Sequence, residues 1–193
     1  ADRPPSHLVV GFAGQLIDRK GLPELMEAWS SLEQRDWAQP PVLRIAGEGV
    51  LAAPLRTWRN TLKFPERVEI LGFVEDMSSF YHGLTMLVMP SRAEGFGLTA
   101  AEAGACALPV IAGRASSLPE IIVPGETGLL VPPCDPVALA EALTKLLDDP
   151  QLTQRLGQAA RIRVSEKFDR ENTLNRLLKI TGQKIPTNPR ENP

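Results

Sequence analysis

One segment of the chain reads Met86-Leu87-Val88-Met89-Pro90-Ser91-Arg92-Ala93-Glu94-Gly95-Phe96-Gly97-Leu98-Thr99-Ala100-Ala101-Glu102. An apolar run ends at Met89, a loop with two glycines follows, and a helical pattern starts near Leu98. Strand, loop and helix in this order form the repeating unit of parallel α/β sheets, in which a crossover helix links parallel strands. The segment therefore predicts an α/β fold, provided that the same unit recurs along the chain.

The same alternation recurs on both sides of this segment. The predicted strands are His7–Ala13, Val42–Ala46, Val68–Leu71, Met86–Met89, Pro109–Ala112 and Gly128–Val131. The helical patterns between them are Gly21–Gln34, Leu51–Lys63, Asp76–His82 and Leu98–Ala105. Short apolar strands separated by helices imply parallel pairing, helices on both faces and right-handed connections. We therefore expect a doubly wound, Rossmann-like parallel sheet.

The chain changes character after Val131. Three amphipathic helical patterns follow without another strand, namely Asp135–Leu147, Gln151–Val164 and Arg170–Ile180. Residues 181–193 are polar and contain prolines, a composition typical of disorder. We expect one domain over residues 1–180 and a disordered tail over residues 181–193.

Composition excludes several classes of partner. The 193 residues carry 21 basic and 23 acidic side chains, so a net charge of −2 offers no global attraction to nucleic acid or to an anionic membrane. Two cysteines, Cys106 and Cys134, are too few for a disulfide framework or a metal site, and fit a reducing cytosol. No run of about eighteen apolar residues, the length needed to span a bilayer, is present. Because the first residue is Ala1, we expect a fragment of a longer protein.

Glycines and prolines cluster where the predicted strands end. They are Gly14, Gly47, Gly49, Gly72, the segment 90–97 and Gly113. In open α/β sheets, ligands bind in the crevice at the carboxyl ends of the strands, where such loops meet. Glycines also make simple tight turns, so it is their concentration at one edge that favours a ligand site.

The loop before Leu98 has the features of a phosphate-binding site. The first amides of a helix lack internal partners and carry the positive end of the helix dipole. Gly95 and Gly97 have no side chain that would keep an anion away from those amides. No Gly-Lys-Ser/Thr follows, so the segment is not a Walker loop.

Two carboxylates, Glu94 and Glu102, flank this loop, although a carboxylate beside a phosphate is electrostatically unfavourable. An ionised carboxylate binds the hydroxyls of a vicinal diol through strong charge-assisted hydrogen bonds. A ligand with phosphates in the middle and diols at both ends fits this pattern, and a nucleotide sugar is such a ligand. The simpler alternative is that Glu94 is a solvated loop residue and Glu102 caps helix amides.

The first predicted strand leads into Gly14-Gln15-Leu16-Ile17-Asp18-Arg19-Lys20-Gly21. Lys20 precedes a helix on the crevice side, where its ammonium would neutralise a leaving diphosphate. Arg19 is a weaker candidate for this role. The alternative for Lys20 is an ordinary solvent-exposed lysine.

An ordered series of short motifs makes the interpretation specific. The motifs are Gly14-x-Leu16 with Lys20-Gly21, Ile45-Ala46-Gly47-Glu48-Gly49, Leu71-Gly72-Phe73-Val74, Pro90-Ser91, Glu94-Gly95-Phe96-Gly97-Leu98 with Glu102-Ala103, Leu108-Pro109-Val110-Ile111-Ala112, Pro119-Glu120, and Gly125-x-Thr127-Gly128-Leu129-Leu130-Val131-Pro132 with Asp135. Together they resemble the C-terminal domain of the retaining glycosyltransferases of family four, the "glycosyl transferases group 1", which is one half of a GT-B fold. The resemblance runs from about Val9 to Lys179.

The resemblance implies a role for each candidate residue. Glu102 would bind the ribose hydroxyls, Glu94 would hold hydroxyls of the donor sugar, and Lys20 would stabilise the departing diphosphate. Backbone amides around residues 96–98 would contact the sugar and diphosphate, and the loop after Val74 would lie near the base. The implied catalytic residues are Lys20 and Glu94. The implied donor-binding set is Gly14, Gln15, Arg19, Lys20, Glu94, Gly95, Phe96, Gly97, Leu98 and Glu102.

One position departs from the family pattern. The family often has arginine where this chain has Gln15, and that arginine joins the lysine in clamping the diphosphate. Glutamine donates hydrogen bonds but carries no charge, and Arg19 lies elsewhere on the loop. We therefore expect a lower donor affinity or rate.

The resemblance also implies a retaining, hexosyltransferase-type enzyme that needs no metal or other cofactor, because basic side chains supply the positive charge. Front-face attack, with the leaving phosphate helping to deprotonate the acceptor, would require no Ser/His/Asp set. The partner domain is the N-terminal half of the GT-B fold, which holds the acceptor site and is missing here, so this chain alone is expected to be inactive. We expect an envelope polysaccharide or lipid-linked acceptor, and a cytoplasmic protein that reaches the inner face of the membrane through that domain.

Other conspicuous residues are expected to be structural. Ser117-Leu118-Pro119-Glu120 has the spacing of a capping box, which predicts a structural role for Glu120, while Ser116 and Ser117 stay candidates for facing the sugar pocket. His82 is expected to pack or to lie at the surface. The three tryptophans, Trp29, Trp37 and Trp58, are expected to pack rather than to stack on sugars.

Two other functions stay open. A binding or scaffold module with a degenerate site is favoured by Gln15 and opposed by the retained Lys20 and Glu102. A non-transferase GT-B enzyme, such as a sugar-nucleotide epimerase, would use different crevice residues, and fold alone does not separate these classes. The base, donor sugar, acceptor and oligomeric state stay undetermined at this stage.

Overall fold

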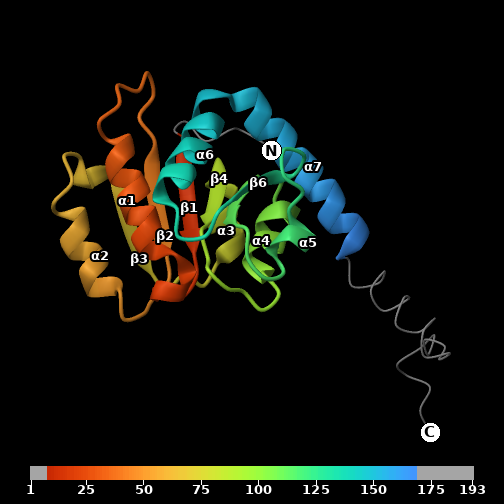
Figure 1. The fold of residues 1–193 in the computed structure, drawn as a ribbon, viewed down its shortest axis with the longest axis horizontal. Coiled ribbons are helices and arrows are strands. Elements are labelled where there is room, and N and C mark those ends of the chain that lie inside the picture. The colour runs from red at the N-terminus through yellow and green to blue at the C-terminus, as the bar shows by residue number, and fades with distance from the viewer. Residues whose placement is uncertain (1–7, 169–193) are drawn as a thin grey trace, which may run out of the picture.

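A computed structural model describes residues 8–168, which form a six-stranded sheet flanked by helices (Figure 1). The strands are β1 (Val9–Ala13), β2 (Val42–Ala46), β3 (Val68–Gly72), β4 (Met86–Met89), β5 (Val110–Gly113) and β6 (Gly128–Val131). Their order across the sheet is β3-β2-β1-β4-β5-β6, and every neighbouring pair is parallel. The strand order reverses between β1 and β4, which is the switch point where open α/β sheets hold ligands. The predicted doubly wound parallel sheet is confirmed.

The central strands bury both of their faces. In β4, Met86 and Val88 belong to one apolar cluster, whereas Leu87 and Met89 belong to the other. Successive side chains of a strand point to opposite faces, so a strand that is apolar throughout needs cover on both sides. This requirement explains why the apolar runs in the sequence are continuous rather than alternating.

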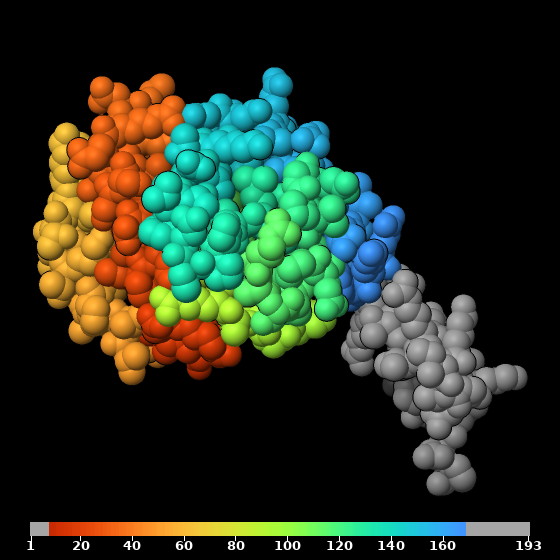
Figure 2. Space-filling model, in the orientation of Figure 1, coloured from red at the N-terminus to blue at the C-terminus, as the bar shows by residue number. Residues whose placement is uncertain are grey.

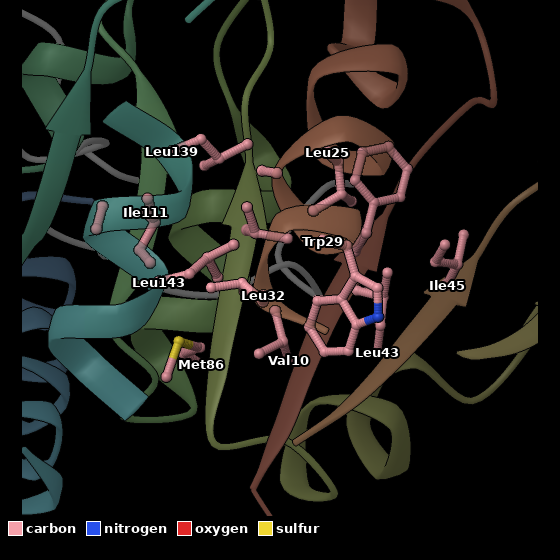
Figure 3. Close-up of a cluster of buried hydrophobic side chains, with 14 of the residues drawn as sticks. Val10, Leu25, Trp29, Leu32, Leu43, Ile45, Met86, Ile111, Leu139 and Leu143 are labelled. Atoms are coloured by element: carbon pink, nitrogen blue, oxygen red, sulfur yellow. The ribbon is translucent and has the colours of Figure 1, made fainter. Parts of the chain in front are cut away.

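Helices supply that cover on each face. The first cluster unites the sheet with α1 (Leu22–Leu32), α2 (Ala52–Arg59) and α6 (Pro136–Asp148). In Figure 3, Leu25 and Trp29 of α1 and Leu139 and Leu143 of α6 gather over strand residues such as Val10. The second cluster unites the opposite face with α3 (Met77–His82), α4 (Leu98–Ala105) and α5 (Leu118–Ile121). Helix α7 (Pro150–Lys167) packs mainly against α4.

Capping by aspartate side chains sets the starts of helices α6 and α7. The carboxylate of Asp135 accepts a hydrogen bond from the amide of Ala138, and that of Asp149 accepts one from the amide of Leu152, each at 2.9 Å. Each aspartate is followed by a proline at the first helical position, where a missing N–H does no harm. Helices α6 and α7 therefore start one residue away from the predicted positions, and α7 continues to Lys167.

The predicted helix Leu51–Lys63 is wrong at its end, because α2 stops at Arg59. The carboxylate of Glu33, which follows α1, accepts hydrogen bonds from the amides of Lys63 at 3.1 Å and Phe64 at 3.0 Å. These bonds hold the two amides outside a helix. Two 3-10 turns, η1 (Asp18–Lys20) and η2 (Pro65–Arg67), were not predicted.

The tryptophans pack as predicted. Trp29 is buried, and the ring N–H groups of Trp37 and Trp58 donate to the Leu32 carbonyl and the Ser30 hydroxyl. The predicted helix Arg170–Ile180 and the tail 181–193 lie outside the described residues. Within residues 8–168, no helix combines the length and the apolar character that crossing a membrane requires.

Candidate functional site

A cleft with a volume of about 440 Å³ lies at the carboxyl ends of the strands, beside the switch point. Its walls come from the loops after β1, β2 and β3 and from helices α3 and α4. The lining residues are Ala13, Gly14, Gln15, Ala46, Gly47, Glu48, Phe73, Val74, Met77, Tyr81, Thr99 and Glu102. Three members of the predicted donor set, Gly14, Gln15 and Glu102, therefore form part of the cleft wall.

Lys20 and Glu94 form a largely buried ion pair next to this cleft. Nζ of Lys20 lies 2.7 Å from Oε1 and 2.8 Å from Oε2 of Glu94, and the side chains are 17% and 8% exposed. The hydroxyl of buried Ser91 donates a further hydrogen bond to Oε1 at 2.6 Å. Cε of Lys20 lies 3.9 Å from the place that a methyl group on Gly14 would occupy, which puts the lysine beside the cleft wall.

This pairing would allow a carboxylate to lie beside the predicted phosphate site. The ammonium of Lys20 compensates the charge of Glu94, and both groups keep capacity for further hydrogen bonds at their exposed edges. Lys20 ends η1, whereas Glu94 lies in the β4–α4 loop, 74 residues later in the chain. In Figure 2 the red and yellow-green segments that contain these two loops meet at the lower edge of the molecule.

Helix α4 starts at a glycine for a steric reason. Gly97 has a φ of +87°, and a side chain there would bring its Cβ to 3.0 Å from the side chain of Leu118 and 3.1 Å from that of Ile121. Gly97 provides no side-chain cap, so the first amides of α4 keep the capacity to bind an anion. Thr99, in the first turn of α4, lines the cleft. A glycine start without a side-chain cap is compatible with phosphate binding, which stays a prediction.

Glu102 has a partner that sequence analysis missed. The hydroxyl of Tyr81 in α3 donates to Oε2 of Glu102 at 2.8 Å. Burial, reinforced by the Glu102 carboxylate, raises the pKa of Tyr81 well above its ordinary value, so the phenol stays a hydrogen-bond donor. Met77 and Tyr81 both line the cleft, and their spacing of one helical turn was the sequence signal for a shared face.

Of the other predicted residues, Gln15 lines the cleft, whereas Arg19, Gly95, Phe96 and Leu98 are not among its lining residues. The side chains of Gln15 and Arg19 are exposed, and the Arg19 carbonyl accepts a hydrogen bond from the amide of Arg92 at 2.9 Å. Gly95 is exposed with open space around it. Phe96 is half exposed and its ring lies edge-on to Phe168, while the Leu98 side chain points largely into solvent.

The capping box predicted at Ser117 and Glu120 is wrong. Ser117 has helical rather than extended backbone angles, and no side-chain capping bond forms. Its hydroxyl instead donates to the carbonyl of Phe96 at 2.8 Å. The amide of Glu94 donates to the Ser116 hydroxyl at 3.4 Å. Both serines therefore support the glycine-containing loop, and their facing the sugar pocket stays a prediction.

Within the part of the chain that the structure describes, no group of three or more His, Cys, Asp or Glu side chains could hold a metal ion. That a reaction at this cleft needs no metal or other cofactor stays a prediction.

Comparison with known proteins gives the site its context. The family model described as "Glycosyl transferases group 1" matches residues 2–163. D-inositol 3-phosphate glycosyltransferase from Corynebacterium efficiens is 38% identical over 159 residues, which are 79% of this chain and 37% of that protein.

Two solved structures share the fold. The C-terminal domain of a group 1 glycosyl transferase, LpcC from Francisella tularensis, has a TM-score of 0.76 at 28% identity and is aligned over 86% of this chain and 88% of its own. HepE from Anabaena, in complex with UDP-glucose, has a TM-score of 0.80 at 25% identity, over 91% of this chain and 48% of its own. The chain spans less than half the length of the curated relatives it matches, but most of a structure that is itself a C-terminal domain.

The family match covers all six strands of the sheet and the loops at the switch point. This chain belongs to the glycosyl transferases group 1 family.

Proposed function

We propose that this chain is the donor-binding domain of a retaining glycosyltransferase and holds a nucleotide-diphospho-sugar at the switch-point cleft. The observation that carries the proposal is the arrangement of charge around the start of α4. Glu102 lies in the cleft wall, the uncapped amides of α4 lie next to it, and the Lys20–Glu94 pair lies beside them. A nucleotide sugar carries a ribose diol, a diphosphate and the hydroxyls of the sugar, in the same order as these three groups of the site.

Each part of such a donor has a place in this arrangement. The ribose hydroxyls would donate to Glu102, whose carboxylate is oriented by Tyr81. The diphosphate would lie on the amides after Gly97, within reach of the Lys20 ammonium, and the sugar would extend toward Glu94. The complex of HepE with UDP-glucose supports a donor of this class, because that protein has the same fold.

The chemistry follows from the charges. When the bond between the anomeric carbon and the diphosphate oxygen breaks, negative charge develops on that oxygen, and Lys20 together with the α4 dipole stabilises it. The acceptor hydroxyl forms the new bond on the same face of the sugar and passes its proton to the departing phosphate. This route retains the anomeric configuration and requires no metal. The binding site for the acceptor would lie in an N-terminal domain. This chain by itself would therefore bind the donor but not transfer the sugar.

Calorimetric titration with UDP, GDP and ADP tests the proposal directly. We expect one of the three to bind with a micromolar-to-millimolar dissociation constant, and Glu102→Ala to weaken that binding at least about tenfold, since hydrogen bonds to a charged group are worth about 1.5–3 kcal/mol. Glu141→Ala, which removes an exposed glutamate on α6, is the matched control and should bind like the wild type. Equal affinity of the two variants would reject Glu102 as a ribose ligand. Binding of none of the three nucleotides would favour a scaffold module.

Retention needs a separate measurement on a protein that also carries the N-terminal half. NMR of the donor and of the newly formed product would compare their anomeric configurations. The same configuration in both is expected, and an inverted product would reject the retaining mechanism.

A further inference from the structure

Arg92 joins the two loops that carry Lys20 and Glu94, although it does not line the cleft. Its Nε and Nη2 atoms lie 2.9 Å and 2.6 Å from Oε1 of Glu24. Its Nη1 atom pairs with the carboxylate of Asp18 in η1. Its backbone amide donates to the carbonyl of Arg19 at 2.9 Å. One residue of the β4–α4 loop is thus attached to the β1–α1 loop and to the first turn of α1.

Glu24 depends on this contact. Its side chain is 8% exposed, and its Oε2 atom is buried without a hydrogen-bond partner. A buried carboxylate is strongly unfavourable unless a counter-ion lies beside it. The two bonds from Arg92 supply that counter-ion, and a planar guanidinium serves two carboxylates at once in a way that an ammonium does not. Glu24 therefore draws the β4–α4 loop toward α1.

Two ion pairs connect the loops at the same separation in sequence. In one pair the β1–α1 loop provides the anion, and in the other it provides the cation. Asp18 pairs with Arg92, and Lys20 pairs with Glu94; each pair is separated by 74 residues. A shift of two residues between the loops would place Asp18 against Glu94, or Lys20 against Arg92, and like charges would then face each other. Only the observed register pairs opposite charges at both positions.

The backbones of the two loops also touch. Gly21 has a φ of +72°, and a Cβ at this position would lie 2.1 Å from the carbonyl oxygen of Pro90. This steric contact fixes only how near the two backbones lie at one point, and it carries no directional bond that would set their register. The directional groups of Arg92 supply the missing restraint.

We infer that Arg92 is a positioning residue, whose ion pairs with Glu24 and Asp18 hold the two loops in the register at which Lys20 meets Glu94. The consequence for donor binding rests on the proposed function, whereas the consequence for loop geometry does not. Loss of Arg92 should loosen the loops first and weaken nucleotide binding as a result.

Amide hydrogen exchange on this chain, without nucleotide, tests the geometric part. In Arg92→Gln we expect exchange of the hydrogen-bonded amides of residues 92 and 94 to accelerate roughly tenfold or more relative to the slowest core amides, because charge-assisted bonds that hold the loop are lost. Arg35→Gln is the control for loss of an arginine ion pair, since Arg35 pairs with Asp148 and neither residue belongs to these loops. In that variant, exchange of the same two amides should match the wild type. Arg92→Lys, which keeps the charge but lacks the fork, should fall between.

A nucleoside diphosphate titration of the same variants completes the test. The dissociation constant should rise roughly tenfold in Arg92→Gln and stay unchanged in Arg35→Gln. Unchanged exchange in Arg92→Gln overturns the inference, whatever the titration shows, since weaker binding alone would mean that Arg92 touches the ligand. A wild type that binds no nucleotide rejects the proposed function, and the exchange comparison still decides the role of Arg92. If Arg92→Gln does not fold, Arg92→Lys and Asp18→Asn provide the same comparison.

Discussion

The hydroxyl of Tyr81 lies 2.8 Å from Oε2 of Glu102 and thereby links α3 to α4 across the wall of the cleft. Tyr81 is buried, so its position is set by packing, whereas Glu102 is exposed and would otherwise rotate freely. A carboxylate oxygen has more than one lone pair, so Glu102 accepts this bond and can still accept those of a diol. The tyrosine therefore orients a binding group without occupying it.

Tyr81→Phe is expected to weaken binding of the nucleoside diphosphate by roughly fivefold, which corresponds to about 1 kcal/mol for one orienting hydrogen bond. The fold should survive, because the ring still fills its place and water can solvate Glu102. Calorimetry on Tyr81→Phe, Glu102→Ala and the double variant gives the measurement. Addition of Tyr81→Phe should have no effect once Glu102 is absent, and an additional loss in the double variant would show that Tyr81 acts independently.

Alkaline pH should destabilise the folded chain through the same tyrosine. The pKa of Tyr81 is raised in the folded state, so above its unfolded value of about 10 the unfolded phenol loses its proton while the folded one keeps it. The stabilising contribution is therefore complete below that pH and declines as the pH rises further, by at most about 1.4 kcal/mol per pH unit for one proton. Urea unfolding of the wild type and Tyr81→Phe, compared at neutral pH and above pH about 10, isolates this term. Parallel losses in both proteins would contradict it.

Substitutions of Lys20 and Glu94 should affect the stability of the fold and the binding of the donor in different ways. Lys20→Met leaves Glu94, 8% exposed, without its cation and should lower the free energy of unfolding by about 1–3 kcal/mol. Glu94→Gln should be milder, because Lys20 is the more exposed partner and can turn to solvent. The double variant should recover part of the stability, which urea unfolding measures through a double-mutant cycle.

The binding of the same variants should follow a different pattern. Lys20→Met should lose affinity for the nucleoside diphosphate, and restored stability in the double variant should not restore it. Glu94→Gln should keep its affinity for the nucleoside diphosphate. If the wild type binds the nucleotide sugar more tightly than the nucleoside diphosphate, the variant should lose that difference. Equal losses for both ligands in Glu94→Gln would place Glu94 at the phosphates rather than at the sugar.

Sequence patterns predicted the sheet well because it is built from local signals. Each strand is a short, mostly apolar run with a glycine or proline at or next to at least one end, and the observed strand bounds differ from the predicted ones by one or two residues at most. The strand order itself was not predicted, although the alternation of strands and helices leaves few unknotted, right-handed topologies. Local rules failed where a distant group intervened, as Glu33 does at the end of α2.

The composition of the candidate site could be predicted, but its internal contacts could not. Glu94, Glu102 and Lys20 stand out by their residue type and position in the loops. The bonds that connect Arg92 with Glu24, or Tyr81 with Glu102, join side chains 68 and 21 residues apart, and no periodicity within one element reveals them. Ser117 shows the same limit, since a motif spacing of a capping box says nothing about the backbone angles of its first residue.

Gln15→Arg is expected to strengthen binding of the nucleoside diphosphate severalfold. Gln15 lines the cleft and is exposed, so an arginine there can reach a phosphate without rearrangement of its neighbours. Exposed charges interact through screened fields, so the gain should be on the order of 1 kcal/mol at low salt and shrink as salt is added. Gln39→Arg, which adds the same charge at an exposed position of the α1–β2 connection, is the matched control. Equal gains in both variants would mean that only net charge matters.

Replacement of Gly95 or Gly97 in the β4–α4 loop by alanine should have different effects on stability. Gly97→Ala forces a left-handed residue and a contact of 3.0 Å with Leu118, so the free energy of unfolding should fall by about 1–3 kcal/mol. Gly95 has no positive φ and open space around it, so Gly95→Ala should stay within about 0.5 kcal/mol of the wild type. If a phosphate approaches this loop, as proposed, the added methyl group at residue 95 should weaken nucleotide binding. Urea unfolding and calorimetry on both variants separate the two effects. A Gly95→Ala variant that binds like the wild type would show that the ligand does not contact the loop at residue 95.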